Sequence, residues 1–234
     1  HDSLGFFAGQ DVRKTPLHDV HVRLGAKMVD FAGWEMPLLF NGIMEEHRHT
    51  RSAASVFDVS HMGRLELTGP DAEPLLERIC TRKLGDATAG QSRYSHVCNQ
   101  EGGILDDVIV SRFEDHWLVV CNASNRDRIV AWLREHAAGR NVEINDRTEE
   151  TFMVAIQGPL AVGIMSRLLP IPIADLKRYH FHSGNYMATP YVIFRSGYTG
   201  EDGVEIILPA SIAQLIAGYP VSYTHLTLPT KRIV

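Results

Sequence analysis

Two adjacent aspartates at the start of an apolar segment constrain the fold of this chain most. Residues 102–110 read Gly-Gly-Ile-Leu-Asp-Asp-Val-Ile-Val. The glycine pair indicates a tight turn, and the β-branched residues after the acids indicate a buried strand. Because successive strand residues point to opposite faces, we expect Asp106 and Asp107 to face opposite sides of one sheet. A carboxylate that enters such a strand needs hydrogen-bond partners.

The aspartate pair by itself is compatible with two interpretations. Aspartate side chains often accept hydrogen bonds from the backbone of their own turn, which would make Asp106 and Asp107 purely structural. The other interpretation is that one of them is a functional carboxylate. The rest of the sequence has to decide between the two.

The composition indicates a globular protein without a nucleic-acid surface. The chain has 234 residues, of which 44% are hydrophobic and 22% charged, and its net charge is −5. No apolar run is long enough to span a membrane, and no signal peptide is recognisable. The three cysteines lie far apart, so we expect free thiols and no zinc site. The pairs His47/His49 and His180/His182 have no supporting cluster of ligands, so no metal is expected.

Short strands and helices alternate irregularly, which predicts an α+β fold with antiparallel sheets and flanking helices. A strand followed by a loop is expected at 28–34. Further strands are expected at 56–59, 65–68, 94–98, 108–113, 117–121, 142–144, 152–157, 191–195 and 204–208. Helices are expected at 17–24, 43–54, 70–79, 126–136, 159–169 and 210–217.

Five motifs in a fixed order carry a resemblance to a known family. They are Lys-Thr-Pro-Leu at 14–17, Gly-Ala-Lys-Met-Val-Asp-Phe-Ala-Gly-Trp-Glu-Met-Pro-Leu at 25–38, Phe-Asp-Val-Ser-His-Met-Gly at 57–63, Gly-Gly-Ile-Leu-Asp-Asp at 102–107 and Arg-Ser-Gly-Tyr-Thr-Gly-Glu-Asp-Gly at 195–203. Each motif is a modest signal, but their order and spacing together are specific. From about Lys14 to Pro220 the chain resembles the aminomethyltransferase, or T-protein, of the glycine cleavage system.

The resemblance implies a domain organisation. Residues 14–220 would form the family's folate-binding domain as two intertwined subdomains, after an N-terminal extension at 1–13. Residues 221–234 show no pattern of their own and are interpreted as a non-native tail. The family's C-terminal barrel domain, which closes over the folate, is expected to be missing.

The resemblance also implies an activity. Members of the family transfer the aminomethyl-derived one-carbon unit from the lipoyl arm of H-protein to tetrahydrofolate. Ammonia is released and 5,10-methylenetetrahydrofolate is formed. Tetrahydrofolate is thus the expected co-substrate, and lipoylated H-protein the expected partner. A monomer without nucleic-acid or membrane partners is expected, in the bacterial cytoplasm or the mitochondrial matrix.

Asp107 matches the catalytic carboxylate of the family. A folate nitrogen must attack a carbon that becomes cationic as ammonia leaves. A fixed carboxylate can orient that amine, accept its proton and stabilise the positive charge. Asp106 is expected to be its structural neighbour. His61 is expected to be a structural histidine.

Five further residues are expected at the folate. Glu201 matches a pterin-binding glutamate, since a carboxylate accepts two adjacent N–H donors in a fork; the alternative is a plain glycine-rich hairpin. Tyr94 and Asn122 match residues that line the pocket, with an ordinary strand tyrosine and a local turn as alternatives. Met62 would line the pocket wall. Arg195 would contact the ligand or pair with a nearby acid.

Three other functions stay open from the sequence. Some relatives bind folate without transferring an aminomethyl group and assist iron–sulfur cluster assembly, but their Lys-Gly-Cys signature is absent here. A folate domain of a dimethylglycine or sarcosine oxidising enzyme is a second possibility. An inert fragment is the third, and tetrahydrofolate binding would distinguish it from the others.

Overall fold

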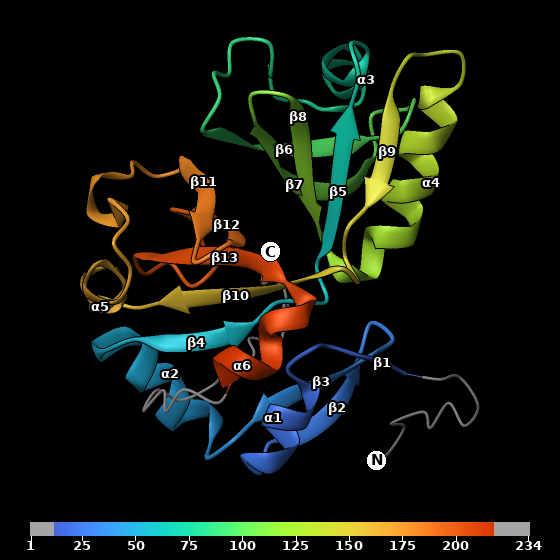
Figure 1. The fold of residues 1–234 in the computed structure, drawn as a ribbon. Coiled ribbons are helices and arrows are strands. Elements are labelled where there is room, and N and C mark those ends of the chain that lie inside the picture. The colour runs from blue at the N-terminus through green and yellow to red at the C-terminus, as the bar shows by residue number, and fades with distance from the viewer. Residues whose placement is uncertain (1–11, 218–234) are drawn as a thin grey trace.

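A computed structural model describes residues 12–217, which form three sheets and the helices that cover them (Figure 1). Sheet A has the order β1 (Arg13–Lys14), β3 (Trp34–Leu39) and β2 (Lys27–Phe31). Sheet B has the order β11 (Phe181–Tyr186), β12 (Thr189–Phe194), β13 (Gly203–Pro209), β10 (Thr151–Gln157) and β4 (Ser55–Asp58). Sheet C has the order β6 (Gln91–Cys98), β7 (Ile104–Arg112), β8 (His116–Cys121), β5 (Gly63–Thr68) and β9 (Glu143–Asp146).

Sheets B and C are antiparallel throughout, and only the short β1–β3 pair in sheet A is parallel. The helices are α1 (His18–Arg23), α2 (Ile43–Ser52), α3 (Ala72–Ile79), α4 (Arg126–Ala137), α5 (Ala161–Leu168) and α6 (Ala213–Ala217), with 3₁₀ turns η1 (Ala123–Asn125), η2 (Ile173–Asp175) and η3 (Ala210–Ile212). The predicted α+β class with antiparallel sheets and flanking helices is therefore confirmed.

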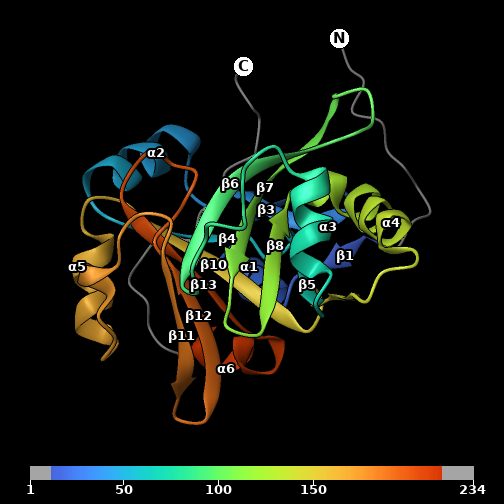
Figure 2. The ribbon, with the colours of Figure 1, turned by 90° about the horizontal axis from the view of Figure 1, so that it is seen from above.

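Three apolar clusters hold these layers together. One lies between sheet C and the pair α3 and α4, which Figure 2 shows side by side. A second lies between sheet B and α5. A third joins the two sheets face to face, with Ile109 and Leu118 of sheet C packed with Phe194 and Ile207 of sheet B. We call this third cluster the intersheet core.

Strand alternation in β7 assigns the two aspartates to different sides of sheet C. Val108 and Val110 belong to the cluster under α3 and α4, whereas Ile109 belongs to the intersheet core. Continuing this alternation backwards puts Asp106 on the helix side and Asp107 on the intersheet side. The opposite orientation expected from the sequence therefore follows from the observed packing.

The structure differs from the predicted elements in a few places. The segment 28–34 belongs to a hairpin of β2 and β3, and its turn uses positive φ angles at Ala32 (53°) and Gly33 (78°). Strand β11 was not predicted, and the helix expected at 210–217 divides into η3 and α6. Arg13, assigned to the extension, lies in β1; most of that extension and the tail at 221–234 lie outside the described residues. Within 12–217, no helix is long and apolar enough to cross a membrane.

Candidate functional site

The end of β8 brings one amide to both aspartates of β7. Asn122 directly follows β8, which pairs with β7 so that Cys121 lies opposite Val108. Its side-chain Nδ2 donates to Asp106 Oδ1 and to Asp107 Oδ1, each at 2.8 Å, and also to the Asp107 carbonyl at 3.1 Å. Asn122 therefore bridges two carboxylates that face opposite sides of the sheet. This contact combines two of the predicted site residues, Asn122 and Asp107.

Asp106 is held entirely by hydrogen bonds within the protein. Its side chain accepts from the Asn122 backbone N–H at 2.8 Å, from Asn122 Nδ2 and from Asn125 Nδ2 at 2.6 Å. Only 1% of its surface is exposed. Three donors and full burial fit the structural role expected for Asp106, because a buried carboxylate requires such satisfaction.

Asp107 faces the intersheet side and has a tyrosine at its second oxygen. The Tyr94 hydroxyl donates to Asp107 Oδ2 at 3.1 Å, while Asn122 donates to Oδ1. This contact follows from the β6–β7 register, in which Tyr94 lies opposite Ile109 and His96 opposite Asp107. Asp107 is 8% exposed, but Tyr94 is 42% exposed. The carboxylate is thus fixed at the edge of a core, beside an aromatic ring that solvent reaches.

Met62 forms part of the apolar wall on the same side of sheet C. Its side chain is buried in the intersheet core with Ile109, Leu118 and Val120. Its backbone carbonyl accepts a hydrogen bond of 2.6 Å from the buried Arg64 guanidinium, which fixes the backbone of Met62. The role of Met62 as a wall of the folate pocket stays a prediction.

Arg195 is occupied by contacts within the protein. Its guanidinium forms a fork with Asp202, from Nε to Oδ1 at 2.8 Å and from Nη2 to Oδ2 at 2.5 Å. Nη1 donates to the carbonyls of Ile173 and Leu176, each at 3.2 Å. The hydrogen bond from Arg195 is the main cause of a lowered pKa at Asp202. This geometry matches the alternative given from the sequence, an internal ion pair, and a ligand contact by Arg195 stays a prediction.

Glu201 pairs with a helix on the outside of sheet B. Its Oε1 accepts from Arg51 Nη1 of α2 at 2.8 Å, and both side chains are partly exposed. Its backbone N–H donates to the Thr199 hydroxyl at 3.2 Å. The contact of Glu201 with Arg51 is an internal ion pair, and its pterin role stays a prediction.

Glu205 is a buried carboxylate that sequence reasoning missed. It lies in β13 opposite Phe194 and Ala155, on the same face as Ile207 of the intersheet core. It is 4% exposed, and its only hydrogen bond among the described residues is that from the Ser196 hydroxyl to Oε2 at 2.5 Å. Burial raises its pKa, against the effect of that hydrogen bond. The sequence does contain a signal for Glu205. Burying the single carboxylate of Val-Glu-Ile-Ile costs free energy unless that carboxylate is hydrogen-bonded or paired.

Tyr198 lies in the glycine-rich loop, two residues after Ser196. Burial raises its pKa, and the charges of Glu205, Asp106 and Tyr94 raise it further, in that order. The residue nevertheless exposes 46% of its surface, so one part of the ring is open to solvent.

The motif residues and the fold agree with one family. A family model described as the GCVT N-terminal domain matches residues 17–217. The chain belongs to the GCVT N-terminal domain family. The expected resemblance to aminomethyltransferases is thereby confirmed.

Relatives of this GCVT domain are aminomethyltransferases of bacteria. That of Rubrobacter xylanophilus is 44% identical over 205 residues, which cover 87% of this chain and 55% of the relative. That of Moorella thermoacetica is 42% identical over 204 residues, with 87% and 56% covered. The chain thus spans about half the length of the curated relatives it matches.

Two solved structures share the fold of this GCVT domain. The glycine cleavage system aminomethyltransferase T of Bartonella henselae superposes with a TM-score of 0.81 at 36% identity, over 88% of this chain and 56% of that one. A chain of the heterotetrameric sarcosine oxidase of Corynebacterium sp. U-96 superposes with a TM-score of 0.59 at 15% identity, over 88% and 91%. The second likeness shows the fold alone.

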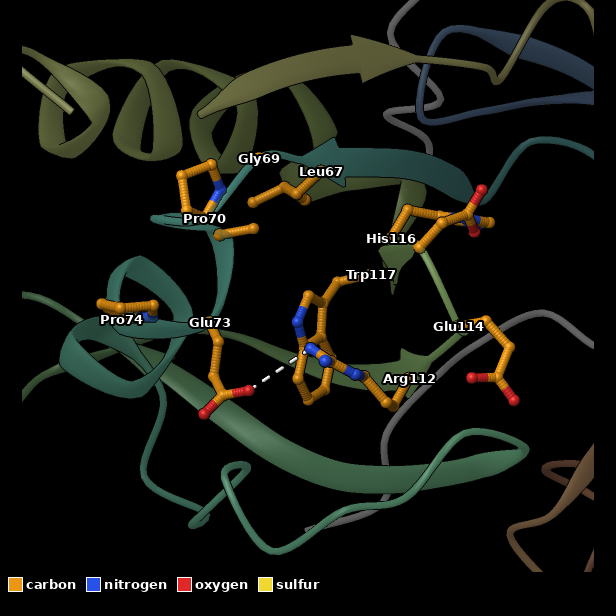
Figure 3. A pocket seen from close by; sticks show the side chains of 11 residues that line it. Leu67, Gly69, Pro70, Glu73, Pro74, Arg112, Glu114, His116 and Trp117 are labelled. Atoms are coloured by element: carbon orange, nitrogen blue, oxygen red, sulfur yellow. Dashed lines mark hydrogen bonds and ion pairs between the residues drawn. The ribbon is translucent and has the colours of Figure 1, made fainter. Parts of the chain in front are cut away.

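A surface hollow on this GCVT domain lies away from the aspartates. It measures about 300 Å³ and is lined by residues of α3 and of the β7–β8 hairpin, among them Glu73, Arg112 and Trp117 (Figure 3). Arg112 lies five residues beyond Asp107 on β7, which is roughly 16 Å along a strand. Its Nη1 donates to Glu73 Oε2 at 3.3 Å. The hollow is therefore at the other end of sheet C and is not part of the site around Asp107.

Proposed function

We propose that this chain is the folate-binding part of an enzyme that transfers a one-carbon unit to tetrahydrofolate. The unit would come from the aminomethyl group on the lipoyl arm of H-protein, with release of ammonia and formation of 5,10-methylenetetrahydrofolate. The observation that carries the proposal is Asp107, fixed by Asn122 and Tyr94 at the edge of the intersheet core. We expect this reaction in a bacterial cytoplasm or in a mitochondrial matrix.

Asp107 has the geometry of a carboxylate that can accept a proton and stabilise a positive charge. Asn122 holds one oxygen and Tyr94 the other, so the orientation of the group does not depend on solvent. In the proposed reaction a folate amine attacks the carbon that ammonia leaves, and Asp107 accepts the proton which that amine loses. The fixed negative charge also stabilises the cationic carbon in surroundings of low polarity.

The residues around the intersheet core fit a pterin. A pterin is flat and carries adjacent N–H donors, for which a carboxylate is the matching acceptor. Glu205 fits this task better than Glu201, because it is buried on the intersheet face while Glu201 is paired with Arg51. Tyr94 and Tyr198 supply partly exposed rings, and Met62 supplies apolar wall. Tetrahydrofolate accepts the one-carbon unit when it is bound.

Replacing the carboxylate with an amide tests the proposal. We expect a full-length protein that contains this domain to form methylenetetrahydrofolate from an aminomethylated lipoyl carrier and tetrahydrofolate. Asp107→Asn should lower that rate about 10²–10⁴-fold, the usual contribution of a general base. Asp115→Asn, a change at an exposed aspartate in the turn between β7 and β8, is the matched control and should leave the rate unchanged. Transfer by Asp107→Asn at the parent rate would contradict the assignment.

Tetrahydrofolate binding separates the remaining alternatives. Binding without transfer would favour a non-catalytic folate module or the folate domain of a dimethylglycine or sarcosine oxidising enzyme. Absence of binding would favour an inert fragment. The identities of 36–44% to aminomethyltransferases, against 15% to the sarcosine oxidase chain, support the transferase.

A further inference from the structure

A fully buried glutamine lies under the glycine-rich loop of residues 195–203. Gln157, the last residue of β10, is 0% exposed and pairs with Gly203 at the start of β13. Its Nε2 donates to the Ser196 carbonyl at 3.0 Å and to the Val204 carbonyl at 3.3 Å. Its Oε1 accepts from the Thr199 hydroxyl at 3.0 Å. One amide therefore contacts the beginning, the middle and the end of the loop.

Two glycines of the loop leave the space which this side chain fills. A Cβ atom added at Gly197 would lie 1.9 Å from Gln157 Oε1, and one added at Gly203 would lie 2.6 Å from Nε2. Neither position can carry a side chain while the amide stays in place. Gly197 thus has a specific packing task, which is close approach to Gln157, whereas a Cβ atom at Gly203 would also lie 2.3 Å from the Ile156 carbonyl oxygen.

The loop carries Ser196, which contacts the buried Glu205, and the partly exposed Tyr198. Ser196 donates to Glu205, and Tyr198 follows two residues later in the loop. The far end of the loop is tied down separately, since the Asp202 carbonyl accepts from Gly158 N–H at 2.8 Å. Between these ties, Gln157 binds Thr199 from the buried side, and Arg51 binds Glu201 at the surface.

We propose that Gln157 is a positioning residue that fixes the 195–203 loop so that Tyr198 and the Ser196–Glu205 pair are presented to the pterin. The pterin part of this inference rests on the proposed function, whereas the loop part does not. Gln157 acts through the loop and does not touch the folate itself.

Two variants separate the loop effect from general destabilisation. Gln157→Leu keeps the approximate shape but removes every hydrogen bond of the amide. Thr199→Val removes the hydroxyl that donates to Gln157 and accepts from the Glu201 N–H, so it tests the same contact at a partly exposed residue and leaves the other hydrogen bonds of Gln157 in place. Ile193→Val, a small truncation in the buried core beside β12, is the control for lost stability.

Hydrogen–deuterium exchange and calorimetry with 5-formyltetrahydrofolate give the two readouts. For Gln157→Leu we expect exchange of peptides covering 196–203 to speed up at least tenfold, and the Kd for 5-formyltetrahydrofolate to rise at least tenfold. Peptides from α3 and α4 should keep the parent rate. Thr199→Val should show smaller changes of the same kind, and Ile193→Val none in the loop.

Each outcome decides one part of the inference. Unchanged loop exchange in both Gln157→Leu and Thr199→Val would overturn it. Faster exchange with an unchanged Kd would overturn the presentation of the pterin by this loop. If the parent chain does not bind 5-formyltetrahydrofolate, the proposed function fails, and the exchange data still decide whether Gln157 fixes the loop.

Discussion

At the scale of single residues, Asn122 has the most unusual position in the site. Its one amide group donates to two carboxylates that come from opposite faces of the same strand. Adjacent carboxylates repel each other when both are ionised, and a shared donor reduces that repulsion. Asn122 is therefore expected to hold the two carboxylates in place, in addition to any contact with folate.

Replacing that amide with a third acid makes the repulsion measurable. Asn122→Asp should lower the free energy of unfolding at pH 7 by about 1–3 kcal/mol, because two acceptors lose their donor and a like charge is added. The loss should shrink as the pH falls towards 4, where carboxylates take up protons. Urea unfolding over this pH range measures it. Asn185→Asp at an exposed position of β11 should be nearly neutral, and an equal loss there would refute the argument.

The sequence identified most residues of this cluster but not their contacts. Asp107, Tyr94 and Asn122 were each predicted as site residues, yet their hydrogen bonds depend on the β6–β7–β8 register. Register is set by tertiary pairing, which a single sequence does not encode locally. Glu205 was not predicted, although a lone acid in an apolar strand is a stronger physical signal than an acid in a glycine-rich motif.

At the scale of elements, the connection between β4 and β5 is a buried polar crossing from sheet B to sheet C. Ser60, His61 and Met62 are all buried there. The Arg64 guanidinium donates to the carbonyls of Ser60 and Met62, and Asp58 accepts from the Ser60 N–H at 2.9 Å. A connection held in this way keeps Met62 in a fixed place relative to both sheets.

His61 in this crossing makes the fold sensitive to acid. Burial lowers its pKa from 6.5 to about 4; the charge of Asp58 opposes the shift and that of Arg64 adds to it. Between pH 6.5 and 4, His61 therefore binds a proton in the unfolded chain but stays neutral in the folded chain. Stability should fall by about 3 kcal/mol as the pH drops through this window. The window lies above that of Asp58, whose pKa is about 2.

The measurement is urea unfolding of the parent and of His61→Phe between pH 7 and 4. The phenyl ring keeps the edge contact to Phe31, whose centroid lies 5.4 Å away, but cannot titrate. We expect the unfolding free energy of His61→Phe to depend less steeply on pH, because the variant lacks the one proton that His61 takes up on unfolding. His47→Phe, at an exposed position of α2, should keep the parent slope. An unchanged slope in His61→Phe would contradict the assignment of this proton.

The sequence predicted the strands that have an apolar face, but it did not predict a strand that forms only because its backbone pairs with a neighbouring strand. Val108–Val110 and Trp117–Cys121 were expected as strands and are found in β7 and β8. Strand β11 contains His182, Ser183, Gly184 and Asn185, which carry no alternating pattern. It forms because its backbone pairs with β12 over six residue pairs, a contact that no local pattern announces.

At the scale of the whole molecule, the intersheet core is both the joint between sheets B and C and the floor of the proposed folate site. Ile109, on the face of Asp107, packs in one cluster with Ile207, on the face of Glu205. The relative position of the two carboxylates thus depends on apolar packing between the sheets. We expect stability and folate affinity to be coupled through this cluster.

A pair of core truncations tests this coupling. Phe194→Ala in the intersheet core should cost about 3–5 kcal/mol of unfolding free energy and also weaken binding of 5-formyltetrahydrofolate. Leu133→Ala, on the buried face of α4 in the other core of sheet C, should cost about 2–5 kcal/mol but leave the affinity of the folded protein unchanged. Denaturation and calorimetry at a temperature where both variants are folded provide the data. Equal affinities in the two variants would show that the joint does not position the site.

The path of the chain through its sheets has a consequence for synthesis. In the sequence, β4 of sheet B is separated from the other strands of that sheet, β10 to β13. All the strands of sheet C lie between them. On a ribosome, sheet C is complete in sequence before β4 has its partner, since Asp58 must wait for Val154. The intersheet face of sheet C, Asp107 included, therefore emerges before the surface that covers it, and β4 is an unpaired edge during the same interval.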